Sequence, residues 1–325
     1  MRNSAIDIAK YVAAILVVGI HTRPFADVSA ELDFAFVEIV CRLAVPFFAV
    51  CTGFYLAKAI TAQANLTSVL RLLRKVMVMY TGWSMIYLLI HLIDWHNSGT
   101  LCSEYLVGWC KSFFISSSYY HLWYLSALIY AMPIYALIIK LAPPRLYLVI
   151  AVPLWIYKAV NYGYVDFLPS VWKGVFSLSF PIDTLMTGVI FMLPLLLAGA
   201  WLANRDIEKM NKKMFWIIAF LFFSLLSFET YHLQTMGGEH YSFIFFTFPL
   251  SIILFACLYL TGRYVNLQSG QLAKVSMTIY CLHPAVVWIL KDYVSHSLLL
   301  FLIIAVVISL ISFIISFIPV KLANR

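Results

Sequence analysis

The segment SAIDIAKYVAAILVVGIHTRPF, at residues 4–25, sets the fold class because it is apolar almost throughout. Apolar runs of about 20 residues, long enough to cross a bilayer as an α-helix, recur from this segment to the end of the chain. The chain has 325 residues, 63% hydrophobic and 11% charged, and its mean hydropathy is +0.93. Soluble domains carry about 25% charged residues. The composition therefore excludes a soluble protein and indicates an all-α, polytopic membrane bundle.

The apolar runs, read against breakers and charges, predict about ten membrane helices in a single transmembrane domain, residues 1–325. More membrane follows the first run directly, so we expect it to be a retained helix and not a cleaved signal peptide. The fifth helix is the least regular, because it is short and contains Pro153. The predicted helices span residues 5–22, 34–58, 72–93, 119–140, 145–160, 184–203, 213–230, 242–262, 272–291 and 298–319.

The charge distribution predicts the orientation. Most of the 22 Lys and Arg residues fall in the segments that share a side with the two termini. The positive-inside rule then places both termini in the cytoplasm. The net charge of +8 therefore reflects membrane topology, and we expect contacts with membrane lipids and not with nucleic acid. Among the six cysteines, Cys102 and Cys110 share one connection, where they are either a disulfide or two free thiols.

The first helix carries three ionisable residues, Asp7, Lys10 and His21. Such residues are costly inside a membrane and are candidates for function. Lys10 and His21 are 11 positions apart, which is three turns plus about 20°, so they share a face about 16 Å apart along the axis. Asp7 lies one turn from Lys10 on that face. Alternatively, Lys10 extends to the inner headgroups and His21 lies at the interface, but the alignment of the three favours a functional stripe.

Further charged candidates come from the next two helices. Arg42 follows Glu38 by four residues, which suits either a structural ion pair or an arginine that stabilises an oxyanion or a ligand carboxylate. Three basic residues, Arg71, Arg74 and Lys75, begin the third helix. Their position suits the positive-inside bias, and their clustering equally suits the phosphates of coenzyme A.

Aromatic residues mark the outer end of the fourth helix, where HLWYL places Trp123 and Tyr124 beside His121. Such rings are either interface anchors or a stacking surface for a ligand. We expect His283, which precedes Pro284, to be structural. No metal-ligand spacing, P-loop, dinucleotide fingerprint or G-x-S-x-G elbow occurs, so no metal is predicted.

Several motifs in order resemble one family. The first helix has an Asp, then a basic residue three positions on, then a His eleven further. It is followed by RLAVPFFAVCTGFYL (42–56), LRLLRK (70–75), YHLWYLSALI (120–129) and IYCLHP (279–284). Together they are similar to the integral-membrane acyltransferase 3 family, whose members transfer acyl groups to extracytoplasmic glycans and other acceptors. The resemblance implies an acyl-CoA donor and a multi-pass protein of the bacterial plasma membrane.

One departure from the family pattern opens an alternative. The family usually has Arg where this chain has Lys10, and Lys lacks the planar fork that binds phosphate or carboxylate through two bonds. The first helix with Lys, and the following RLAVPFF, also resemble the membrane half of vancomycin-resistance serine racemases. In those proteins a cytoplasmic pyridoxal-phosphate racemase follows the last span. We therefore expect this chain to be either a stand-alone relative or the membrane part of a longer protein.

The resemblance and the residues predict an O-acyltransferase, of the class that transfers groups other than aminoacyl groups. It would move an acyl group, most simply acetyl from acetyl-CoA, to an extracytoplasmic hydroxyl of the cell envelope. The competing hypothesis is a carrier that supplies L-serine to a racemase, and a weaker one is a scaffold without turnover. The predicted site comprises His21 as general base with Lys10 and Asp7; Arg71, Arg74 and Lys75 for the donor; and Arg42, Glu38, His121, Trp123 and Tyr124 for the acceptor.

Overall fold

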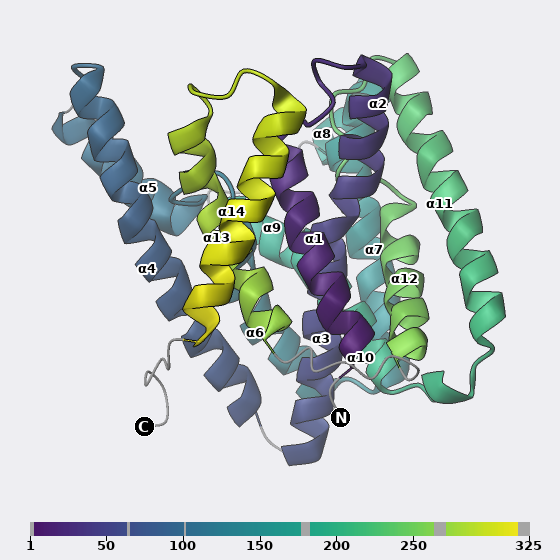
Figure 1. Ribbon diagram of the computed structural model, residues 1–325. Coiled ribbons are helices and arrows are strands. Elements are labelled where there is room, and N and C mark those ends of the chain that lie inside the picture. Colours follow the sequence, from purple (N-terminus) through teal and green to yellow (C-terminus); the bar gives the residue numbers. More distant parts are fainter. Residues whose placement is uncertain (1–2, 64–65, 101, 177–182, 263–270, 318–325) are drawn as a thin grey trace. The chain divides into compact units, whose positions relative to one another are not determined.

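The computed structural model describes residues 3–63, 66–100, 102–176, 183–262 and 271–317, and every regular element within those ranges is helical (Figure 1). Nine helices of the described chain are long and apolar enough to cross a membrane. A tenth apolar helix, α12 (Thr247–Thr261), is shorter. The predicted polytopic all-α bundle is therefore confirmed. The sidedness of the bundle stays a prediction, and Arg2, Arg263, Lys321 and Arg325, which contributed to it, lie outside the described residues.

Backbone contacts group the chain into two compact units. The first comprises Met1–Val45 and Phe255–Arg325, and the second comprises Pro46–Leu254. The boundaries fall in sequence within α3 (Ala44–Gln63) and within α12. We expected a single transmembrane domain over residues 1–325. That expectation stays a prediction, because the grouping of contacts does not test it.

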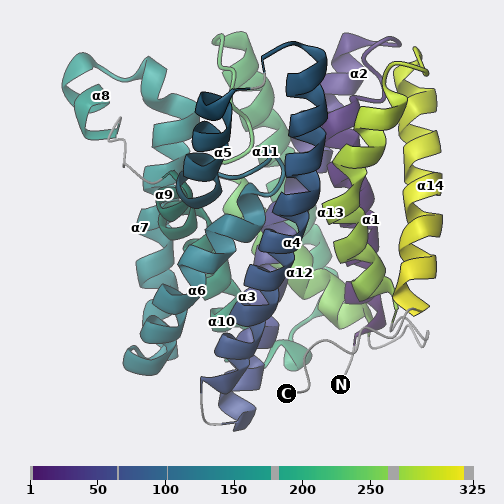
Figure 2. The ribbon, with the colours of Figure 1, turned by 90° about the vertical axis from the view of Figure 1, so that its left-hand side faces the viewer.

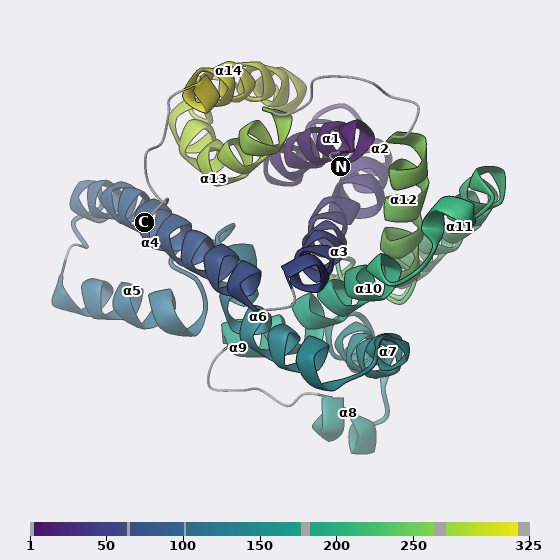
Figure 3. The same cartoon turned by 90° about the horizontal axis from the view of Figure 1, so that it is seen from below.

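The core of the first unit consists of α1 (Ser4–Thr22), α13 (Leu272–Leu290) and α14 (Ser297–Phe317), which pack against one another (Figure 3). Asn3 caps the start of α1 by accepting a hydrogen bond from the backbone of Ile6, so it satisfies one of the helix's open N–H groups. The hydroxyls of Tyr11 and Ser309 share a 2.9 Å hydrogen bond between α1 and α14. These contacts stabilise the start of α1, which carries the predicted stripe, and hold it against α14.

The second predicted helix, 34–58, is longer than expected and is not a regular α-helix throughout. It begins as α2 (Ala30–Phe34), continues as the π-helix η1 (Ala35–Val40) and the 3₁₀-helix η2 (Cys41–Leu43), and ends as α3. A Cβ atom at Gly19 of α1 would lie 3.1 Å from both the Cys41 sulfur and the Phe36 ring. The glycine therefore lets η1 and η2 approach α1 closely.

The second unit holds the remaining helices. Its most buried element is α10 (Leu193–Ala203), whose residues 193–200 are all buried and which packs against α7 and α6. The other elements are α4 (Thr67–Asn97), α5 (Ser103–Ile115), α6 (Trp123–Leu141), η3 (Pro144–Leu146), α7 (Tyr147–Ala159), η4 (Val160–Tyr164), η5 (Val165–Phe167), α8 (Ser170–Phe176), α9 (Asp183–Thr187), η6 (Gly188–Met192), η7 (Ile207–Lys209) and α11 (Lys212–Thr235).

The segment between the third and fourth predicted spans is not an irregular connection, because it folds as α5. This helix lies beside α4 (Figure 2), and ring contacts join Trp95 to Tyr105 and Tyr80 to Phe113. Cys102 caps α5 and Cys110 lies within it, and both thiols are free. A helix separates positions eight residues apart by about 12 Å, which is too far for a disulfide. The disulfide alternative is therefore wrong.

Candidate active site

The three residues of the predicted stripe, Asp7, Lys10 and His21, all lie in α1. Because α1 is continuous from Ser4 to Thr22, Lys10 and His21 share a face, and three turns of helix separate them. Asp7 is buried, whereas Lys10 and His21 are half-buried. Lys10 and His21 therefore do not contact each other, and any reaction that uses both must place a long substrate along the helix.

His21 has an aromatic partner in the same unit. Its ring stacks on the ring of His283 in α13, with 5.2 Å between the ring centroids and 25° between the planes. Arg42 is near enough for its positive charge to act on the His21 ring. The structure therefore joins the end of α1 to the LHP motif of α13, where we expected only a structural histidine.

Local chemistry fixes the orientation of His283. Its Nδ1 lies 2.8 Å from the carbonyl oxygen of Tyr280 and 3.2 Å from that of Ile279. Pro284 lacks an N–H group, so the carbonyl four residues earlier, at Tyr280, has no intrahelical donor. Carbonyl oxygens only accept hydrogen bonds, and we therefore assign the hydrogen to Nδ1. In the neutral ring, Nε2 is then the acceptor.

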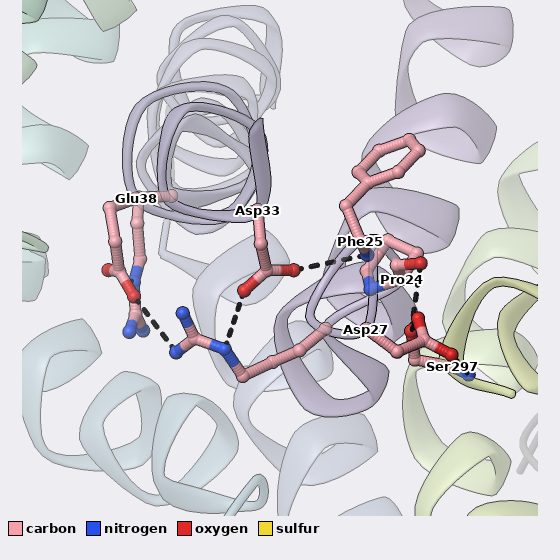
Figure 4. Close-up of polar contacts among 8 residues, drawn as sticks. Pro24, Phe25, Asp27, Asp33, Glu38 and Ser297 are labelled. Atoms are coloured by element: carbon pink, nitrogen blue, oxygen red, sulfur yellow. Dashed lines mark hydrogen bonds and ion pairs between the residues drawn. The ribbon is translucent and has the colours of Figure 1, made fainter. Parts of the chain in front are cut away.

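A second polar group in the first unit consists of Arg23, Asp33, Glu38 and Arg42 (Figure 4). Arg23 Nε lies 2.8 Å from Asp33, and Arg23 also approaches Glu38 at 3.5 Å. Arg42 Nε lies 2.8 Å from Glu38, so the expected pairing of these residues four positions apart is present. The two carboxylate side chains are only 3% and 7% exposed, whereas those of Arg23 and Arg42 are 50% and 32% exposed. Two acids are thus neutralised by two guanidinium groups that remain accessible.

Arg23 reaches Asp33 and Glu38 because it ends α1 in a left-handed conformation, with φ at 46°. Its backbone N–H donates to Gly19, which closes the last turn of the helix. Asp33 in turn accepts a hydrogen bond from the backbone of Phe25 (Figure 4). Arg23 was not among the site residues predicted from the sequence. The signal was the Thr-Arg-Pro sequence directly after His21, which ends a helix and turns the chain.

The predicted acceptor residues of the second unit have two different environments. His121 is buried, and its ring packs edge-on against Tyr87 at 4.8 Å and against Tyr119 at 5.7 Å. Tyr124 is also buried, whereas Trp123 is half-buried and contacts the rings of Phe191 and Phe243. Trp123 also meets the ring of Tyr124 edge-on, with 6.4 Å between the centroids, so it lies between Tyr124 and the rings of Phe191 and Phe243.

The predicted donor residues begin α4. Arg71, Arg74 and Lys75 are all exposed, and their spacing places them on one side of the helix. A cavity of about 700 Å³ lies in the same unit, lined by Leu66 at the start of α4, by Lys140 and Tyr147, and by Asn204 after α10. This cavity was not predicted, because its walls combine α3, α6, η3 and α7 with residues that flank α4 and α10.

Comparisons with known proteins identify a family and several relatives. A family model described as an acyltransferase domain matches residues 3–320. Two curated proteins of Enterococcus faecalis, each named amino-acid racemase, are 27% and 26% identical to the chain, over 94% and 71% of its length and 45% and 33% of theirs. A serine/alanine racemase of Enterococcus gallinarum is 25% identical, over 87% of this chain and 41% of that protein. The chain thus spans less than half the length of these relatives. No solved structure matches.

Proposed function

Since the chain belongs to the acyltransferase family matched by that model, we propose that it moves an acyl group from a cytoplasmic acyl-CoA to an extracytoplasmic hydroxyl. Acetyl-CoA is the simplest donor, and a cell-envelope glycan is the acceptor class. The observation that carries the proposal is the stacking of His21 on a second, backbone-anchored histidine. Imidazole is the side chain whose ordinary pKa suits proton transfer near neutral pH.

In the proposed reaction, His21 takes the proton of the acceptor hydroxyl. The hydroxyl oxygen attacks the thioester carbonyl, the bond between that carbon and sulfur breaks, and the released thiolate takes the proton from His21. Arg42, whose guanidinium acts on the same ring, is suited to the negative charge that develops on the carbonyl oxygen. A neutral His283 ring stacked on His21 offers a π-face to the imidazolium that forms.

Positively charged lysine and arginine side chains would bind the donor. Lys10 is about 16 Å from His21 along α1, so it would contact the pantetheine or phosphate part of the donor while the acyl group reaches His21. Asp7, one turn before Lys10, would orient the ammonium group. Arg71, Arg74 and Lys75, which begin α4 in the second unit, were predicted for the donor phosphates as well, and their clustered positive charge supports that role.

A second candidate function is the transport of a small amino acid such as L-serine. It is favoured by the names of the curated relatives and by the charged group around Glu38. Arg23 and Arg42 suit a ligand carboxylate, and Asp33 and Glu38 suit an ammonium group. A zwitterion therefore matches the same residues that would surround the acyl acceptor.

One experiment with two arms separates these functions. Purified protein in detergent is supplied with acetyl-CoA, and thiol release is measured for the wild type, His21→Ala and Lys10→Ala. The acyltransferase predicts slow thiol release that is lost in His21→Ala, and donor binding that weakens in Lys10→Ala. Absence of donor binding at millimolar acetyl-CoA, together with uptake of labelled L-serine into proteoliposomes, would instead establish the carrier.

A further inference from the structure

A lysine buried in the second unit has no role in the proposed reaction. Lys158 lies in the last turn of α7 and is only 8% exposed. A lysine near a helix end usually extends its amine to water or headgroups. Here the amine is enclosed, so its environment needs an explanation.

Within the described residues, Lys158 forms no ion pair and no hydrogen bond. Its Nζ lies over two aromatic rings, 4.5 Å from the centroid of Tyr162 and 5.0 Å from that of Phe243. Burial of an ammonium group is costly, and cation–π contacts offset only part of that cost. The aromatic rings alone therefore leave part of the cost uncompensated, and an anion is the group that would complete the site.

Glu229, a buried carboxylate of the same unit, already accepts hydrogen bonds from other groups. Glu229 of α11 accepts hydrogen bonds from the backbone N–H groups of Phe245 and Phe246, at 2.8 Å and 2.9 Å, and from the hydroxyl of Tyr164, at 2.5 Å. It thereby holds the segment that carries Phe243 and the π-helix that carries Tyr162. Glu229 builds the surroundings of Lys158 but does not neutralise it.

The rings around the amine form one continuous cluster. Phe243 lies 4.6 Å from Tyr162, 4.2 Å from Phe191 and 6.0 Å from Trp123 between ring centroids. Tyr162 and Phe191 belong to the π-helices η4 and η6, a geometry that is frequent at functional sites. Trp123, Tyr162 and Phe243 are half-buried, so a ligand that reaches the amine would also meet their apolar faces.

We propose that Lys158, with Trp123, Tyr162 and Phe243, binds the carboxylate of a sugar acid, with the ring of the sugar against the aromatic faces. The inference goes beyond the proposed function, because it assigns a ligand to a lysine that the proposed reaction does not use. An ammonium group recognises the carboxylate, and the broad apolar faces of the rings suit the C–H face of a pyranose. Phosphate groups, free or in a lipid headgroup, are the other source of negative charge.

The test is equilibrium binding of D-glucuronate and D-glucose, which differ in the carboxylate, to full-length protein without any acyl-CoA. We expect wild type to bind glucuronate at least about tenfold more tightly than glucose, a difference of about 1.4 kcal/mol. Lys158→Met removes this preference, Lys158→Arg keeps it, and Lys111→Met, at an exposed lysine of α5, is the matched control. Equal affinity of wild type and Lys158→Met for glucuronate would overturn the proposal.

Two further measurements cover a variant that does not fold and a ligand that is a phosphate. If Lys158→Met does not fold, wild type alone suffices: glucuronate, and not glucose at the same concentration, must raise its thermal midpoint. Displacement of glucuronate by inorganic phosphate or by vesicles of anionic phospholipid at equal concentration would assign the site to phosphate and overturn the sugar acid. Because binding is measured without acyl-CoA and acyl transfer by thiol release, failure of this site and failure of acyl transfer are observed separately.

Discussion

At the residue scale, His283 is the finding with the clearest chemical consequence. Its Nδ1–H donates to a carbonyl that Pro284 leaves without a helical donor, and its ring supports His21. His283 and Pro284 are adjacent in α13, and together they fix the position of His21, which lies in α1. The role of His283 in the proposed function is to position His21 and not to contact the substrate.

His283→Phe tests this positioning role. The variant keeps an aromatic ring against His21 but loses the hydrogen bond to Tyr280, which is worth about 1 kcal/mol. We expect acyl transfer to fall about tenfold, with a change in the pH dependence of kcat and little change in the donor KM. A thiol-release assay over a range of pH values measures both. An unchanged pH profile would show that His283 only fills space.

Arg23 combines a strained backbone with ion pairs, and two variants separate these contributions. Arg23→Ala and Arg23→Gly both remove the contacts to Asp33 and Glu38. Only glycine adopts φ near 46° without the cost of about 1–2 kcal/mol that other residues incur there. We expect Arg23→Gly to be the more stable variant by about 1 kcal/mol in denaturant unfolding. Equal stabilities would contradict the assigned backbone strain.

At the element scale, glycines set the packing of the second unit. A Cβ atom at Gly199 of α10 would lie 2.2 Å from the carbonyl oxygen of Val50 in α3, and one at Gly53 would lie 2.1 Å from that of Leu196. The two helices therefore cross with their backbones in contact, as small residues allow in membrane proteins. The apolar pattern predicts both helices, but it carries no information on which glycines face a neighbour.

Gly199→Ala should therefore separate two helices. We expect a loss of about 1–3 kcal/mol from overpacking, measured as a lower thermal midpoint in detergent. Gly82→Ala is the matched control, because no atom lies within 4 Å of a Cβ at that position of α4 and alanine favours the helix. A Gly199→Ala variant as stable as Gly82→Ala would refute the close crossing.

The start of α14 is held by a carboxylate whose contribution depends on pH. Asp27 accepts hydrogen bonds from the hydroxyl and from the backbone N–H of Ser297, and these bonds hold the pKa of Asp27 below its usual value of 3.8. A lowered pKa means that the stabilisation is fully present above that usual value and is lost as the pH falls below it.

Asp27→Asn should consequently weaken protection of the first turn of α14 at neutral pH. Hydrogen exchange at the amides that follow Ser297 measures this local opening. Wild type and variant should converge as the pH falls below about 3.8. A difference that persists at lower pH would mean that the charge of Asp27 does not cap the helix.

At the scale of the whole molecule, hydropathy was sufficient for the all-α membrane class, because each span must be apolar along its length. The irregular turns of η1, η4 and η6 were not predicted, since a single extra residue per turn leaves no mark in an apolar pattern. The pairing of Glu38 with Arg42 was predicted because it is local. The stacking of His21 on His283 was not, because those residues are brought together by helix packing.

The family model and the curated relatives match different shares of their lengths. The chain spans less than half the length of the curated racemases that it matches, whereas the acyltransferase model spans residues 3–320 of the chain. The proposed transfer therefore depends on the membrane helices and their histidine pair, which lie within the residues that the acyltransferase model matches.

The most direct measurement uses proteoliposomes that enclose acetyl-labelled acetyl-CoA, with membrane-impermeant fragments of cell-envelope glycan only outside. Wild type should transfer label to the external glycan, and so should His232→Ala, a control at an exposed histidine. In His21→Ala the transfer rate should fall by a factor of about 10²–10⁴. Label transfer by His21→Ala at the wild-type rate would contradict the assigned base. No transfer by wild type, in vesicles that accumulate L-serine, would contradict the acyltransferase itself.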